Sequence, residues 1–300
     1  MKYLYLIKYL LKVFLRNPAQ LFKEIKTDLK KDLNYRKFNS KHKKVLIFGL
    51  PKSGTTLVEE ILEQLPYVRL NRTPVRFYIH PNLKDSHAIN DESFKFFSEK
   101  KYSFLKTHSY FDNKHIDLVK KYNAKILICF RDIRDVMISR YNHVLADKNH
   151  WQHEEIIDLP THEGFLKSLT SLNNSPSENK IAPIEEYYNW VYNWLSFKGI
   201  NNYNILWYEE YIKDPISYIN KILSDLDFKE FDAKIIENTL AALRKKNEHT
   251  KLKNKLRRAG KGVSTFREGK SGGWKDFFDD HTYKKFISYL PGPIEKVLQK

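Results

Sequence analysis

One stretch near the start of the chain, VLIFGLPKSGTTLVEE over residues 45–60, constrains the fold more than any other. The apolar run Val45–Phe48 ends at a glycine and predicts a buried strand, while apolar residues at helical spacing after Thr55 predict a helix. A strand, a glycine-bounded loop and a helix N-terminus direct unpaired N–H groups and the positive end of the helix dipole at one spot. The stretch therefore predicts an anion site at the end of a strand.

The position of the lysine in this loop narrows the kind of anion. The loop of nucleoside triphosphatases reads G-x-x-x-x-G-K-[ST], with lysine directly after the second glycine. Gly49 and Gly54 have that spacing, but Thr55 stands where the lysine belongs and Lys52 lies inside the loop. The loop thus indicates a phosphate-type ligand without the usual ATP–magnesium arrangement. A tight strand–helix turn with a solvated lysine is the plain alternative.

The rest of the chain alternates strand and helix patterns, which predicts a single P-loop-like α/β domain with a central, mostly parallel sheet flanked by helices. In such sheets ligands bind beyond the carboxyl ends of the strands. We expect strands at Val45–Phe48, Ser103–Lys106, Lys125–Phe130 and Tyr203–Trp207. We expect helices at Thr55–Gln64, Lys114–Tyr122, Asp135–Leu145, Ile184–Phe197, Pro215–Asp225 and Asp232–Lys245.

The chain divides into an N-terminal extension and this domain. Residues 1–44 are predicted to form an amphipathic helical extension, and residues 45–300 the α/β domain. Residues 146–183 show little periodicity and predict a long loop or lid that carries specificity. Residues 247–273 are strongly basic, contain five glycines and predict a mobile segment.

Composition limits the class of function. No run of 18 or more apolar residues occurs, so no transmembrane span is predicted. Cys129 is the only cysteine, which excludes an intrachain disulfide and a cysteine zinc cluster; its apolar surroundings predict a core residue. A chain without disulfides is compatible with a reducing compartment, and we expect a cytoplasmic protein.

A net charge of +17 is compatible with nucleic acid, anionic lipid or a polyanionic small ligand. The sequence contains no zinc finger, no RNP aromatic motif and no glycine–arginine tract, which argues against nucleic acid. Residues 2–16 place Lys8, Lys12 and Arg16 on one helical face and apolar residues on the remainder. This helix either packs on the domain or lies peripherally in a membrane interface; both alternatives stay open.

Two further stretches follow expected strands. In FLKTHSYF, residues 104–111, Lys106 and His108 share one side of an extended chain, and a histidine pKa near neutrality suits proton transfer. In ICFRDIRDVMISRYNH, residues 128–143, Arg131 ends an apolar strand and can bind two phosphate oxygens. Asp132 or Asp135 can cap the next helix. The charges that we expect to be solvated in this stretch are Arg134 and Asp135.

A last stretch lies near the C-terminus, FREGKSGGWKDFF over residues 266–278. Arg267 offers a second guanidinium, and Gly269 lets backbone amides approach an anion. Trp274 is predicted to anchor the segment by burial.

Together these four stretches resemble, in order and spacing, the motifs of sulfotransferases that use 3′-phosphoadenosine 5′-phosphosulfate (PAPS), in particular the cytosolic type. PKSGTT resembles the family's 5′-phosphosulfate loop, and KTH resembles the motif that holds its catalytic histidine. In LWYEEYIKDP, residues 206–215, Tyr208 resembles a family tyrosine near the adenosine. The resemblance implies sulfuryl transfer to a hydroxyl or an amine of a small-molecule, lipid or carbohydrate acceptor, leaving 3′-phosphoadenosine 5′-phosphate (PAP).

The resemblance also implies roles for single residues. His108 takes the acceptor proton, Lys52 stabilises the leaving 5′-phosphate and Lys106 helps to hold the sulfuryl oxygens. No metal is required, because lysines supply the positive charge. The implied cofactor ligands are Lys52, Ser53, Gly54, Thr55, Thr56, Leu57, Arg131, Ser139, Tyr208, Arg267 and Gly269.

The chain departs from the family pattern near the base and the adenine. The family often has a proline after the histidine, a second basic residue in the last stretch, and aromatic residues around the purine. Without those aromatics, adenine would be held by apolar contact, or by Trp207 or Phe266. In this chain Tyr110 replaces the proline and Glu268 replaces the second basic residue. Leu57 and Leu240 replace the aromatic residues.

Alternatives stay open at this point. Glu59 or Glu60 is a rival base, although their charged helical stripe predicts surface exposure. Outside the family, the chain could be a P-loop-type ATP-dependent kinase, which Thr55 argues against, or a basic non-enzymatic protein that binds membranes or nucleic acid. The sequence predicts neither the acceptor, nor whether its reacting atom is oxygen or nitrogen, nor the oligomeric state.

Overall fold

The computed structural model describes most of the chain from residue 44 onward. The described residues are 44–65, 68–70, 102–109, 111–173, 181–197, 203–226, 233–257 and 271–299, with single residues at 18, 19, 22, 25, 26, 29, 89, 91 and 94. The strands among them are β1 (Lys44–Gly49), β2 (Val68–Leu70), β3 (Tyr102–Thr107), β4 (Ala124–Phe130) and β5 (Tyr203–Trp207). The helices are α3 (Thr55–Gln64), α5 (Asn113–Lys121), α6 (Ile133–Ala146), α7 (His153–Ile156), α8 (Thr161–Thr170), α9 (Pro183–Ser196), α10 (Tyr208–Lys213), α11 (Pro215–Asp225), α12 (Ala233–Arg257), α13 (Trp274–Phe277) and α14 (Asp280–Ser288), followed by the 3-10 turn η2 (Ile294–Lys296).

The five strands form one sheet in the order β2-β3-β1-β4-β5, and every pair is parallel. Phe48 of β1 pairs with Thr107 of β3, and Phe130 of β4 pairs with Trp207 of β5, so these strands end at one edge. This confirms the predicted α/β fold with a parallel sheet. The sequence pattern did not predict β2, because three residues are too few to show a period.

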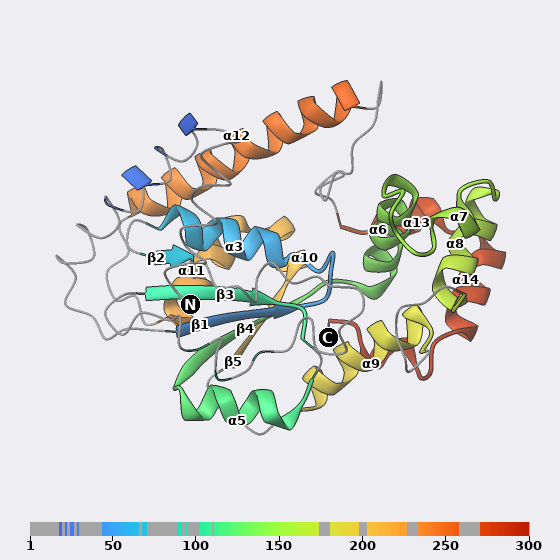
Figure 1. Cartoon of the computed structure of the whole chain (residues 1–300), viewed down its shortest axis with the longest axis horizontal. Coiled ribbons are helices and arrows are strands. Elements are labelled where there is room, and N and C mark those ends of the chain that lie inside the picture. Colours follow the sequence, from blue (N-terminus) through green and yellow to red (C-terminus); the bar gives the residue numbers. More distant parts are fainter. Residues whose placement is uncertain are drawn as a thin grey trace.

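The sheet separates two apolar cores, because successive strand residues point to opposite faces. Val45 and Ile47 pack with α3, α11 and α12 in one core. Leu46 and Phe48 pack with α5, α6 and α9 in the other. Figure 1 shows α3 and α12 above the sheet and α5 below it. Cys129 is buried in the first core, as predicted.

Helices α6, α7, α8, α13 and α14 form a group beyond the end of the sheet (Figure 1). The sequence predicted a long loop or lid over residues 146–183, but helices α7 and α8 lie in the part that the structure describes. The role of this stretch as a lid stays a prediction. Buried polar contacts fix α7 and α8: Arg140 of α6 donates from Nη2 to Gln152 Oε1 (2.6 Å) and from Nη1 to the Ser168 carbonyl (3.1 Å). The local sequence did not predict these helices because tertiary contacts of this kind stabilise them.

Helix α12 is longer than predicted. It runs to Arg257, whereas the sequence predicted that the helix ends at Lys245. Residues 247–257 are therefore helical, and the mobility of the basic segment stays a prediction. No proline or glycine interrupts the sequence between Ala233 and Arg257, which lets the helix continue through its lysine-rich half. The basic residues 258–270 lie outside the described part of the chain.

Most of the predicted N-terminal extension, including residues 2–16, lies outside the described residues. The described positions in the extension that have helical backbone are Pro18, Ala19, Phe22, Ile25, Lys26 and Leu29. Within the part of the chain that the structure describes, every helix is too short or too polar to cross a bilayer.

Candidate active site

The loop between β1 and α3 turns sharply because two of its residues have positive φ, Lys52 (77°) and Gly54 (99°). Glycine is favoured at such a position, and it also leaves room for Tyr208: a Cβ on Gly54 would lie 3.1 Å from Tyr208 Cδ2. Gly49 is required by close packing, since its Cβ would lie 2.4 Å from Thr55 Cγ2. The loop therefore has the tight form that brings the N-terminus of α3 over the end of β1.

The hydroxyl groups of the loop have different surroundings. Ser53 is buried, and both its amide (3.1 Å) and its hydroxyl (2.8 Å) donate to the Leu50 carbonyl. Ser53 therefore shapes the loop with its donors. Thr55 is buried at the first position of α3, whereas Thr56 beside it is exposed. Since Gly54 caps α3 without a side-chain hydrogen bond, the first amides of the helix point at the space above the loop.

Lys52 is largely buried in the loop. Burial lowers the pKa of its ammonium group from 10.5 to about 8, because removal from water penalises the charged form. An anion next to the ammonium group would offset this penalty. Lys52 thus has the electrostatic environment of a ligand-binding lysine.

His108 follows β3 and lies against the loop. Its Nδ1 is 2.5 Å from the Gly49 carbonyl, and a carbonyl only accepts, so Nδ1 carries the hydrogen. In the neutral ring Nε2 is then the nitrogen whose lone pair can accept a proton. The next carbonyl, that of Ser109, accepts from Trp190 Nε1 at 2.9 Å, so α9 holds the segment that carries the histidine. The sequence did not predict that the Gly49 carbonyl binds His108, because a backbone acceptor leaves no pattern in the sequence.

Lys106, at the end of β3, forms an ion pair with Glu59 of α3. Glu59 is only 4% exposed, so the prediction that it lies on the surface is wrong. The helical stripe that contains Glu59 faces the end of β3 because α3 packs across the sheet there. Glu60 is half-buried.

Arg131 lies directly after β4 and contacts both the loop and the start of α10. Its Nη1 donates to the Lys52 carbonyl (3.5 Å), and its guanidinium carbon is 4.8 Å from the centre of the Tyr208 ring. Burial raises the pKa of Tyr208, which keeps its phenol neutral. The structure thus brings Arg131, Tyr208 and the loop together, although they are far apart in the sequence.

The prediction that Arg134 and Asp135 are solvated charges is wrong. Arg134 binds the Asp132 carboxylate through Nε (2.9 Å) and Nη2 (2.5 Å), and its guanidinium carbon lies 3.6 Å from the centre of the Trp274 ring. Asp132 also caps α6 by accepting from the amide of Arg134. Asp135 is 4% exposed and accepts from two amides of the C-terminal segment. The capping residue of α6 is therefore Asp132, whereas Asp135 binds the backbone of the C-terminal segment at Gly272 and Trp274.

The remaining predicted cofactor ligands are only partly described. Ser139 is half-buried two turns into α6. Leu57 and Leu240 pack against the same apolar core, between α3 and α12. Trp207 is buried against Phe130, with ring centres 5.1 Å apart, so it is not available as a shelf for adenine. Those that lie outside the described residues are Phe266, Arg267 and Gly269, together with Glu268 and Tyr110.

His143, near the end of α6, is a site residue that the sequence did not single out. Its ring lies 6.4 Å from that of His150, and its Nδ1 is buried without a hydrogen-bond partner among the described residues. Burial lowers the pKa of His143, and the charge of Lys52 lowers it further, so this ring lies within electrostatic reach of the loop.

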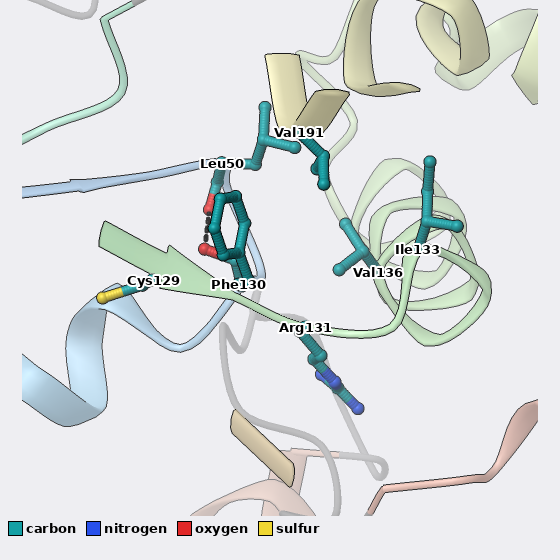
Figure 2. Close-up of a pocket in the computed structure, with 8 residues that line it drawn as sticks. Leu50, Cys129, Phe130, Arg131, Ile133, Val136 and Val191 are labelled. Carbon is teal, nitrogen blue, oxygen red and sulfur yellow. Dashed lines mark hydrogen bonds between the residues drawn. The ribbon is translucent and has the colours of Figure 1, made fainter. Parts of the chain in front are cut away.

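Figure 2 shows a narrow pocket behind the loop, between the ends of β1 and β4 and helices α6 and α9. Leu50, Phe130, Val136 and Val191 line it, and it is too narrow to hold a water molecule. The guanidinium of Arg131 points away from these apolar side chains. The pocket is therefore a packing gap behind the site.

Known proteins resemble this chain along most of its length. The family described as "Sulfotransferase domain" matches residues 42–292. Sulfotransferase 2A6 of Mus musculus is 25% identical over 280 residues, which cover 86% of this chain and 89% of that protein. The crystal structure of mouse sulfotransferase SULT7A1 complexed with PAP superposes with a TM-score of 0.56 at 19% identity, covering 85% of each chain. That of retinol dehydratase with androsterone and inactive cofactor PAP gives 0.53 at 18% identity, covering 83% of this chain and 82% of that one.

Proposed function

The chain belongs to the sulfotransferase domain family, and from that premise we propose that it transfers a sulfuryl group from PAPS to a hydroxyl or an amine of a small acceptor. This assignment replaces the ATP-dependent kinase and the non-enzymatic binding protein as explanations of the loop. One observation carries the proposal: Lys52, His108 and Arg131 meet at one edge of the sheet, where the loop after β1 touches the segments after β3 and β4.

The described donors suit a nucleotide with an anion at each end. Around the loop they are the buried ammonium of Lys52, the hydroxyl of Thr55 and the first amides of α3, which would hold the 5′-phosphosulfate. Arg131, supported by the Tyr208 ring, and Ser139 would hold the 3′-phosphate. When bound, PAPS supplies an activated sulfuryl group whose leaving group is a 5′-phosphate. The two solved structures described above contain PAP, which supports this choice of nucleotide.

His108 is the proposed general base. The Gly49 carbonyl fixes the hydrogen on Nδ1, so the neutral ring offers Nε2 as the proton acceptor. Removing the acceptor proton increases the nucleophilicity of the attacking oxygen or nitrogen. General bases of this kind contribute about 10²- to 10⁴-fold to a rate.

Lys52 and Lys106 are the proposed electrostatic groups. The ammonium of Lys52, beside the 5′ end, offsets negative charge that develops on the leaving phosphate oxygen. Lys106 would hold sulfuryl oxygens, and its ion pair with Glu59 fixes its side chain against α3. A carboxylate that is already paired with a lysine is less suited to accept the acceptor proton, which favours His108 over Glu59 as the base.

Nucleotide preference tests the proposal directly. Thermal unfolding is measured with PAP, with ATP and magnesium, and with 5′-AMP at equal concentrations. A ligand at 100 times its Kd stabilises the folded state by about 2.7 kcal/mol, so PAP is expected to give the largest increase in Tm. A larger increase with ATP would overturn the proposal. Labelled PAPS incubated with panels of phenols, alcohols and amines then identifies the acceptor.

We also propose that the N-terminal extension binds the surface of an anionic membrane. Phe22, Ile25 and Leu29 are 66%, 42% and 59% exposed, each has helical backbone, and their sequence spacing is i, i+3 and i+7. The preceding residues 2–16 combine apolar residues with a basic face. The test is sedimentation with phosphatidylserine–phosphatidylcholine vesicles. We expect the full chain in the vesicle pellet and a variant with serine at the three exposed positions in the supernatant. Equal retention of both proteins would refute the idea.

A further inference from the structure

Asp135 of α6 binds a segment that lies more than a hundred residues away in the sequence. Its Oδ2 accepts from the amide of Gly272 (2.7 Å), and its Oδ1 accepts from the amide of Trp274 (3.0 Å). The carboxylate therefore caps the start of α13 from another helix, since Gly273, the N-cap of α13, makes no side-chain hydrogen bond. Asp135 is 4% exposed, so the two amides replace water around a buried charge.

The neighbouring side chain strengthens the same contact. The guanidinium carbon of Arg134 lies 3.6 Å from the centre of the Trp274 ring, and the ring of Tyr283 is nearly parallel to that indole, with an interplanar angle of 18°. Asp132 holds Arg134 in this position through two hydrogen bonds. Trp274 is therefore fixed from α6 and from α14.

A second carboxylate links this contact to α10. Glu209 Oε1 accepts from the amide of Asp132 (3.1 Å) and from the hydroxyl of Ser271 (3.3 Å). Glu209 follows Tyr208, whose ring lies against Arg131. The segment Ser271–Trp274 thus contacts the start of α6, which follows Arg131, and the start of α10, which carries Tyr208.

The same carboxylate oxygen of Asp135 also faces Arg131. Arg131 Nη2 lies 3.7 Å from Asp135 Oδ2, the atom that accepts from Gly272. One buried carboxylate therefore orients a guanidinium after β4 and docks the start of α13.

We propose that Asp135 is a positioning residue of the 3′-phosphate site, which orients Arg131 after β4 and docks the C-terminal segment Ser271–Trp274 against the start of α6. This inference rests on the proposed function. It also explains why an acidic residue stands one helical turn from a phosphate-binding arginine. Its charge is directed at two amides and a guanidinium, and not at the ligand.

Asp135→Asn tests the inference with little change of shape. An asparagine oxygen can accept from one of the two amides, but its NH₂ group cannot accept from the other, and it carries no charge for Arg131. The matched control is Asp214→Asn. Asp214 also accepts from two backbone amides, those of Ile216 (3.1 Å) and Ser217 (3.0 Å), at the start of α11.

Two measurements are made on the full-length protein. The first is the ratio of the Kd of 5′-AMP to the Kd of PAP, which isolates the contribution of the 3′-phosphate. We expect Asp135→Asn to reduce this ratio about tenfold, because a charge-assisted contact is weakened while the 5′ end is untouched. The second is amide hydrogen exchange of a peptide that covers Gly272–Phe277, without nucleotide. We expect faster exchange in Asp135→Asn and no change of either quantity in Asp214→Asn.

The outcomes separate the inference from its premise. Wild-type protein that binds PAP no more tightly than 5′-AMP would refute the proposed function. If the wild type prefers PAP and Asp135→Asn keeps that preference, the role of Asp135 is refuted while the proposed function stands. Unchanged amide exchange at Gly272–Phe277 in this variant would have the same meaning. If Asp135→Asn does not fold, Arg134→Gln carries the test, since it removes the contact with Trp274 and leaves the carboxylate in place. It is expected to change both quantities in the same direction by a smaller factor.

Discussion

The pKa of Lys52 makes the affinity for PAP depend on pH in a calculable way. Burial lowers that pKa to about 8 in the free protein, whereas the protonated ammonium is the form that attracts the 5′-phosphate. The binding form is present below this pKa and is lost as the pH rises through it. A group with this pKa is about nine-tenths charged at pH 7 and about one-tenth charged at pH 9.

The expected size of the effect follows from these fractions. If PAP binds only the charged form, the Kd increases about tenfold between pH 7 and pH 9. Two nearby groups with shifted pKa values titrate outside this window: burial lowers the pKa of His150 to about 4 and raises that of Tyr208 above its usual 10. The phosphates of PAP are almost fully ionised at pH 7, because their second pKa is about 6.

Isothermal titration with PAP at several pH values measures the effect. The matched variant is Lys52→Arg, because a guanidinium stays charged over the whole range. Its Kd is expected to be constant from pH 7 to pH 9, even if it is weaker than that of the wild type. A constant Kd in the wild type, or the same increase in Lys52→Arg, would refute the assignment of the pH dependence to Lys52.

Three further predictions concern the base, the 3′ end and the loop. His108→Ala is expected to reduce kcat at least about 100-fold with little change in the Kd of PAP. Glu59→Gln is expected to reduce kcat less. If a labelled-PAPS assay gives the opposite order, Glu59 is the general base. Arg131→Lys is expected to raise the Kd of PAP about tenfold, because an ammonium cannot bind two phosphate oxygens as a fork does; an unchanged Kd in titration would exclude this contact. Gly54→Ala is expected to cost about 1–2 kcal/mol of stability, since its φ is 99° and the new Cβ would press on Tyr208; an unchanged Tm would contradict the strain.

Sequence patterns predicted the parts of this molecule that depend on local order. The apolar run Val45–Phe48 and the glycines around Lys52 specify a strand and a tight turn by themselves, and both occur in the structure. Parallel pairing then explains why segments after different strands meet at one edge, since parallel strands end on the same side.

The parts that could not be predicted depend on contacts between distant residues. Asp135 looks like an ordinary charge in the first turn of a helix, and only the docked segment at Gly272 and Trp274 accounts for its burial. Glu59 likewise belongs to a charged stripe, and its burial depends on the packing of α3 against Lys106. Helices α7 and α8 have too weak a local preference to be recognised without the buried side chain of Arg140.

Helix α6 has consequences for how such a protein diversifies. Its first turn holds the C-terminal segment through Asp135, and its third turn holds α7 and α8 through Arg140. Its 14 residues keep these two anchor points on one rigid rod about 21 Å long. Mutations in residues 147–173 that spare the contacts of Arg140 can therefore reshape that end without displacing Arg131. Under the proposed function, if residues 147–173 contact the acceptor as the sequence predicts, substitutions at this end of α6 would change the acceptor and leave the nucleotide site intact.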